Sequence, residues 1–71
     1  METIPSLITT LRSRVGQLSA RAVGGEDLNT SGITDGNESI NVAVTHYGNG
    51  DFEDAREALQ LAREQLDAAE Q

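Results

Sequence analysis

Side chains with oxygen ligands gather between residues 27 and 38, in a stretch that also contains Gly and Thr. A hard cation such as Ca²⁺ takes about six to eight oxygen ligands, mainly from carboxylates and amides. Carboxylates stand at both ends of the stretch, and Gly32 allows a sharp turn between them. These side chains are therefore candidate ligands for Ca²⁺, and the other interpretation is a mobile, solvated loop that binds no ion. The candidate ligands are Asp27, Asn29, Ser31, Asp35 and Glu38.

The spacing of these residues resembles the loop of an EF-hand. In that family the first, third, fifth, ninth and twelfth positions supply side-chain or water-mediated ligands, and the sixth is Gly. Asp27 takes the first position, Gly32 the sixth and Glu38 the twelfth, which is the place of the bidentate carboxylate. Thr34 departs from the pattern, because the family has an aliphatic residue there. The resemblance is confined to residues 27–38 and implies a calcium-binding protein.

Few other residues are candidates for chemistry. His46 is the only imidazole, and the chain has no Cys and no Lys. A histidine that acts as a general base needs an oriented acid and a pocket, and 71 residues leave little volume for a pocket. Glu53 and Glu57 are expected on an exposed helix face. We therefore expect a protein without enzymatic activity.

Apolar residues recur every three or four positions between residues 4 and 23, which predicts an amphipathic helix. Pro5 suits its first turn, where the missing N–H has no partner in any case. Gly24 and Gly25 supply a left-handed stop. The apolar stripe consists of Ile4, Leu7, Ile8, Leu11, Val15, Leu18 and Ala22.

Residues 24–38 are predicted to form a flexible loop, because Gly, Asn, Asp, Ser and Thr dominate there. A short second helix is expected over residues 39–47, with Ser39 or Asn37 as its N-cap. A strand over residues 40–45 is the alternative, since β-branched residues alternate there. We favour the helix, because the chain offers no second convincing strand to pair with it.

The turn over residues 47–52 is the best-defined local feature of the sequence. Gly48 ends the preceding helix, Asn49-Gly50 makes the turn, and Asp51 is placed to cap the next helix. A third helix is predicted over residues 51–69, because apolar residues follow an alternating spacing of three and four. This seam consists of Phe52, Ala55, Leu59, Ala62, Leu66 and Ala69.

The hairpin of residues 39–62 resembles a tetratricopeptide repeat. In that family small residues meet across two helices that a Gly-Asp-aromatic turn joins. Ser39 departs from the pattern, because an aromatic residue is usual there, and only one such unit is present. The resemblance implies a surface for a peptide or partner protein, and the alternative is a convergent helical hairpin. The matching residues are Ala43, Gly50, Asp51, Phe52, Ala55, Leu59 and Ala62.

A chain of 71 residues builds only a thin core, and without Cys it has no disulfide to reinforce it. The apolar residues of the first and third helices also exceed what a short second helix can cover. We therefore expect a homo-oligomer, with a dimer as the first choice. The predicted interaction face consists of Leu7, Leu11, Val15, Leu18, Phe52, Leu59 and Leu66.

The formal net charge is -7, and all five cations are Arg. This composition resembles that of haloarchaeal proteins, in which carboxylates keep the surface hydrated; a GC-rich genome is the alternative explanation. A field this negative disfavours nucleic acids and anionic membranes as partners. It suits a basic protein partner, as in an antitoxin-like regulator. No long apolar run and no secretory signal is seen, so we expect a cytoplasmic protein.

The charge is unevenly distributed along the chain. Residues 1–23 carry +2 (three Arg, one Glu), whereas residues 24–71 carry -9 (two Arg, eleven acids). We therefore expect the first helix to lie against the acidic third helix, in the same chain or in a partner. The sequence as a whole predicts one all-α domain, either a three-helix bundle or a helix plus a helical hairpin. The leading function is protein–protein interaction through helix packing, and the alternatives are calcium binding and antitoxin-like regulation.

Overall fold

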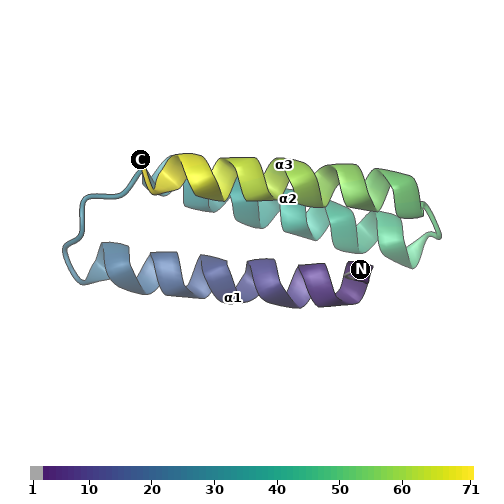
Figure 1. Ribbon diagram of the computed structural model, residues 1–71, viewed down its shortest axis with the longest axis horizontal. Helices are drawn as coiled ribbons and strands as arrows, with labels where there is room; N and C mark the ends of the chain where they lie inside the picture. Colours follow the sequence, from purple (N-terminus) through teal and green to yellow (C-terminus); the bar gives the residue numbers. More distant parts are fainter. Residues whose placement is uncertain (1–2) are drawn as a thin grey trace.

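The computed structural model describes residues 3–71 as three helices joined by two short connections. Helices α1 (Ile4–Val23), α2 (Thr30–Gly48) and α3 (Phe52–Ala69) alternate in direction, so α1 and α3 point the same way (Figure 1). The bundle is elongated, with extents of 39 × 18 × 17 Å. The predicted all-α fold is confirmed, and the alternative strand is not formed, because residues 40–45 lie inside α2.

Helix α1 begins and ends where the sequence predicts. The side chain of Thr3 caps its N-terminus, since Oγ1 accepts a hydrogen bond from the backbone N–H of Ser6 at 3.2 Å. Pro5 lies in the first turn, as expected. At the other end Gly25 has a φ of 99°, a left-handed conformation that Gly adopts without a Cβ clash.

Helix α2 is much longer than predicted, because it begins at Thr30 and not at residue 39. The flexible loop predicted over residues 24–38 is therefore wrong for residues 30–38, which are helical. Only residues 24–29 connect α1 to α2. The third helix, in contrast, lies close to its predicted range of residues 51–69.

Asn29 caps α2 in place of the two residues that the sequence suggested, Asn37 and Ser39. Its Oδ1 accepts a hydrogen bond from the backbone N–H of Ser31 at 3.2 Å. Its own backbone N–H donates to the carbonyl oxygen of Ala69 at 3.0 Å. The start of α2 is thereby tied to the end of α3.

Two glycines explain why a loop-like stretch is helical. Gly32 and Gly36 are buried against α3. A Cβ atom at Gly32 would lie 2.8 Å from the carbonyl oxygen of Gln65 and 3.2 Å from Cα of Ala69; one at Gly36 would lie 2.7 Å from Cδ2 of Leu66. A glycine inside a helix costs about 1 kcal/mol relative to alanine. Close packing of α2 on α3 offsets that cost.

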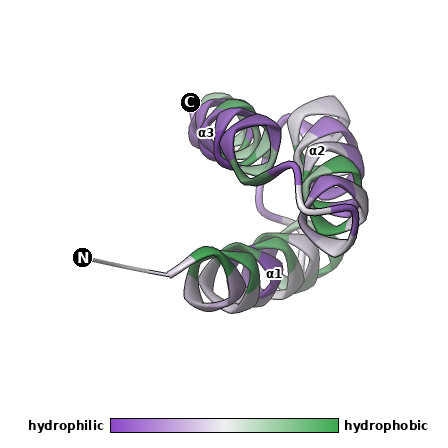
Figure 2. Ribbon diagram, turned by 90° about the vertical axis from the view of Figure 1, so that its right-hand side faces the viewer, coloured by the Kyte–Doolittle hydropathy of each residue, from purple (hydrophilic) through white to green (hydrophobic). Residues whose placement is uncertain are grey.

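The core lies between the α2–α3 hairpin and α1. The two helices of the hairpin contact each other far more extensively than either contacts α1. Viewed along the bundle, α1 turns apolar residues toward the hairpin (Figure 2). The buried apolar side chains are Ile4, Leu11, Leu18, Ile33, Ile40, Ala43, Ala55, Leu59, Ala62, Leu66 and Ala69.

Most of the predicted interaction face is used inside the chain. The long α2 packs against both other helices and covers side chains that a short second helix would have left open. Phe52 is the exception, since its side chain is 54% exposed. Of the others, Leu11, Leu18, Leu59 and Leu66 are buried, and Leu7 and Val15 are half-buried.

We expect Gly32→Ala and Gly36→Ala each to lower the free energy of unfolding by about 1–3 kcal/mol, because an added methyl group overpacks the α2–α3 contact. The matched control is Gly16→Ala, since no atom lies within 4 Å of a Cβ placed there. That substitution should raise the free energy of unfolding by up to about 1 kcal/mol. Urea denaturation measures all three variants. Stabilisation by all three would contradict the close approach of the two helices.

Candidate functional site

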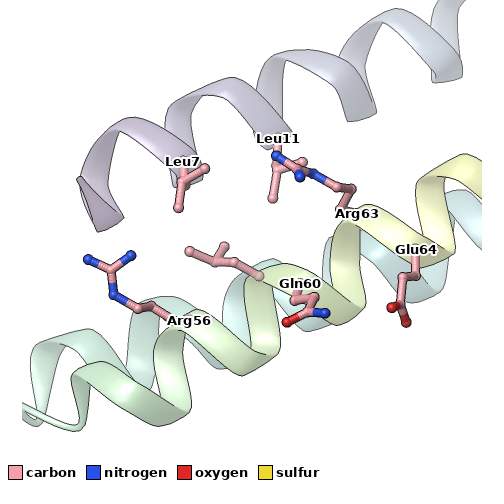
Figure 3. A pocket seen from close by; sticks show the side chains of 7 residues that line it. Leu7, Leu11, Arg56, Gln60, Arg63 and Glu64 are labelled. Carbon is pink, nitrogen blue, oxygen red and sulfur yellow. The ribbon is translucent and has the colours of Figure 1, made fainter. Parts of the chain in front are cut away.

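A groove of about 330 Å³ lies between α1 and α3 and is open to solvent. Leu7 and Leu11 of α1 (Figure 3) supply its apolar surface together with Leu59 of α3. Leu11 and Leu59 are buried members of the core, whereas Leu7 is half-buried at the rim. The groove is therefore a place where the core comes close to solvent. Its polar lining comes entirely from α3 and consists of Arg56, Gln60, Arg63 and Glu64.

Two arginines flank the apolar surface of this groove. Arg56 and Arg63 are seven residues apart, which places them on the same side of α3, two turns from each other. Both side chains reach toward α1, while Glu64 is turned away from it (Figure 3). Within residues 3–71 neither arginine forms an ion pair. The groove thus offers two guanidinium groups beside apolar surface.

The arginines in the C-terminal half of α1 are paired. Arg14 Nη2 lies 2.6 Å from Oδ1 of Asp67 and 3.4 Å from Oε2 of Glu70. Arg21 pairs with Glu26 and also lies 3.3 Å from Oε1 of Glu70. This arrangement confirms that the basic first helix lies against the acidic third helix, and it does so within one chain.

The pKa of Arg21 is raised above its usual value. The largest cause is its hydrogen bond to the Glu26 carboxylate, and the negative charges of Glu26 and Glu70 act in the same direction. The partners of Arg21 are about half exposed, and surface ion pairs contribute little individually. Each of these pairs therefore makes a small contribution to the position of α1 and to the stability of the fold.

The structure does not bring the predicted calcium ligands together. Asp27 lies in the connection and Asn29 is an N-cap, whereas the other three lie on α2. Ser31 and Glu38 are separated by seven helical residues, about 10.5 Å along the axis. An ion that binds its ligands at about 2.3–2.6 Å cannot contact both. Residues 30–38 therefore do not form the EF-hand-like loop. Of the five candidate ligands, only Asp35 and Glu38 line the same surface groove.

The α2–α3 turn gathers a different set of polar side chains. One ligand atom each from His46, Asp51 and Asp54 lies within 4.8 Å of the others. Asp51 stands at the N-cap position of α3, but its side chain makes no capping hydrogen bond. Its Oδ2 atom instead lies 3.9 Å from Nδ1 of His46. One imidazole with two surface carboxylates is a poor donor set for zinc.

The two aromatic rings lie together at the end of the hairpin. The ring centroids of Tyr47 and Phe52 are 5.4 Å apart with an interplanar angle of 45°. Gly50 adopts a left-handed φ of 81° between them. Ala43 and Ala55, the small residues of the repeat-like pattern, are fully buried. These contacts show that the residues of the turn pack the end of the hairpin together.

A second, shallower groove of about 200 Å³ lies on the outer face of the hairpin. Val42 and Leu61 are 49% and 48% exposed there. Beneath them Oγ of Ser39 donates a hydrogen bond to Oε1 of Gln65 at 2.6 Å, which links the two helices. This outer groove is apolar along its middle and acidic at one end, where Asp35 and Glu38 lie.

Of the side chains that line the α1–α3 groove from α3, only Leu59 belongs to the predicted interaction face, and the polar ones are not among the predicted functional residues. The available signal was the position of Arg56 and Arg63 on either side of Leu59, with Gln60 between them, on one side of a well-predicted helix. This arrangement indicates a groove only when α1 is known to lie beside this side of α3. The placement of α1 was expected from charge, but its register against α3 was not.

We expect Arg14→Gln to lower the free energy of unfolding by about 0.5–1 kcal/mol in dilute buffer, because it removes the contacts with Asp67 and Glu70. Salt at 1 M shortens the screening length to about 3 Å and should reduce the effect. Arg12→Gln is the control on the same helix, since Arg12 makes one exposed hydrogen bond, to Asn41. Equal effects of both variants at low and high salt would contradict this role of Arg14.

No helix among residues 3–71 is long and apolar enough to cross a membrane. Comparisons with known protein families, with curated proteins and with solved structures give no match to this chain.

Proposed function

We propose that this protein is a non-enzymatic interaction module that binds a helical segment of a partner protein in the α1–α3 groove. The observation that carries the proposal is the open groove itself, in which the half-buried Leu7 lies at the rim and the buried Leu11 and Leu59 form the floor. A small bundle gains stability when such surface is covered. A partner helix supplies that cover and adds a fourth member to the bundle.

The direction of the helices suits a helical partner. Helices α1 and α3 run the same way, so the groove between them follows their axes (Figure 1). Amphipathic helices commonly lay an apolar face into a groove of this kind, with contacts at every third or fourth residue. The groove volume is at the lower end of the range for small-molecule pockets, and its open side favours a ridge of side chains.

The chemistry of the lining supports binding and not catalysis. The polar residues are Arg56, Gln60, Arg63 and Glu64, and none of the lining side chains is a hydroxyl, thiol or imidazole nucleophile. His46 lies at the α2–α3 turn, outside the lining of the groove. The groove offers apolar contact, hydrogen bonds and charge, which together serve recognition.

A photoreactive amino acid at Gln60 tests this proposal in cells that produce the protein natively. We expect cross-links from Gln60 to a protein partner, because Gln60 is exposed and lines the groove. The control position is Ser13, which is exposed on α1 and does not line the groove. Equal cross-linking from both positions, or none from Gln60, would contradict a docking role for the groove.

We also propose self-association through the outer groove of the hairpin as a second candidate. Val42 and Leu61 are half exposed and lie together in this groove, where a second copy would bury them. Burial of such side chains is favourable by roughly 25 cal/mol for each Å² of apolar surface removed from water. This contact leaves the α1–α3 groove free for another partner.

Light scattering after size exclusion tests the dimer. We expect a dimer mass for the wild type and a monomer mass for Leu61→Glu, because a carboxylate buried at the contact has no partner there. Thr10→Glu, on the exposed side of α1, is the charge-matched control. A wild-type monomer at high micromolar concentration would rule out the dimer and leave the groove proposal intact.

A further inference from the structure

We infer that the α1–α3 groove accepts a particular kind of partner, an acidic amphipathic helix. Its apolar ridge would pack on Leu7, Leu11 and Leu59, and two of its carboxylates would pair with Arg56 and Arg63. The inference rests on the proposed function and adds the chemistry of the partner. It is opposite in sign to the basic partner that the net charge of -7 suggests.

The distribution of arginines carries the inference. The chain has five arginines, and three of them have partners inside the protein. Arg14 and Arg21 pair with carboxylates, and Arg12 donates a hydrogen bond to Oδ1 of Asn41 at 3.2 Å. The other two flank the groove, and within residues 3–71 they form no ion pair. The arginines left over are thus located where apolar surface is also open.

The spacing of the two arginines favours a helix over an extended segment. Seven residues of α3 correspond to about 10.5 Å along the helix axis. A helix laid alongside repeats its own side chains with the same period, so carboxylates seven residues apart meet both guanidinium groups. In a strand the same distance corresponds to roughly three residues, and residues three apart point to opposite faces.

A second copy of this chain is a poor occupant through its own α3. A two-fold contact centred on the groove places two α3 helices antiparallel, with the axis near Gln60. Such an axis is perpendicular to both helices, so the edge that carries the arginines lies on the same side of the contact in both copies. Arg56 of one copy therefore lies beside Arg63 of the other. Two guanidinium groups that lie side by side repel each other. The groove therefore suits a different protein with acidic residues.

The negative net charge does not prevent this recognition. At an ionic strength of 0.15 M, charges farther apart than about 8 Å are largely screened. Direct contacts between guanidinium and carboxylate groups persist, and bidentate hydrogen bonds strengthen them. Glu64 is the one acidic residue in the lining, and its carboxylate is turned away from α1 (Figure 3).

The test uses a synthetic helical peptide of about 20 residues, long enough to hold a helix. It carries leucines along one face and two glutamates seven residues apart at the edge of that face. A second peptide has lysine at the same two positions. Binding of each peptide to the full chain is measured by fluorescence anisotropy at 0.15 M salt. Amide NMR shifts of Leu7 and Gln60 identify the groove as the place of contact.

We expect the acidic peptide to bind more tightly than the lysine peptide. Arg56→Gln and Arg63→Gln should each weaken its binding about two- to five-fold, the range of an exposed ion pair. Arg12→Gln is the matched control, because it removes one positive charge from α1 outside the groove and should leave the affinity unchanged. Circular dichroism of each variant verifies that the helices remain folded.

Equal binding of the two peptides, or indifference to both arginine variants, would overturn the inference. So would groove shifts caused by dodecanoate with none caused by either peptide, since that result identifies a small anionic amphiphile as the ligand. The wider proposal is judged separately by cross-linking from Gln60. If Gln60 captures a partner whose binding ignores both arginine substitutions, the groove binds a protein but does not select acidic helices.

Discussion

The close contact of α2 with α3 is the constraint on which the rest of the structure depends. Gly32 and Gly36 present no Cβ atoms to α3, so the backbone of the facing helix lies where side chains would normally separate the two. This contact keeps α2 helical back to Thr30 and leaves only a short connection to α1. Because that connection is short, α1 must fold back beside the hairpin. The groove exists because α1 then runs parallel to α3.

The sequence was informative where local rules decide the structure. The bounds of α1, the position of α3 and the turn between α2 and α3 follow from the apolar period and from the placement of proline and glycine. The predictions for them are close, except that the side chain of Asp51 makes no capping hydrogen bond. The first half of α2 was not predicted to be helical, because glycines among Asn, Asp, Ser and Thr have the composition of a loop. What makes them helical is the shape of α3 opposite them. That is a property of two segments together, which no single stretch of sequence displays.

The functional residues divide in the same way. The candidate calcium ligands have a spacing along the chain that suits a loop, and this spacing does not bring them together because Ser31, Asp35 and Glu38 lie on a helix. The attraction between the basic first helix and the acidic third helix followed from charge alone, and the contacts of Arg14 with Asp67 and Glu70 display it. The groove could not be predicted from the sequence, because its lining depends on the register of α1 against α3. Charge predicts that α1 lies against α3, but it does not predict the register of the two helices.

The position of the Arg14 and Arg21 ion pairs has a consequence for motion. They fasten the C-terminal half of α1 to the end of α3, near the connection that joins α1 to α2. The N-terminal half of α1 has no ion pair within residues 3–71 and is held by apolar contacts of Ile4, Leu7, Ile8 and Leu11 with the core. Salt screens ion pairs but does not weaken apolar burial. A rise in ionic strength therefore loosens the C-terminal half of α1 and leaves the half beside the groove in place.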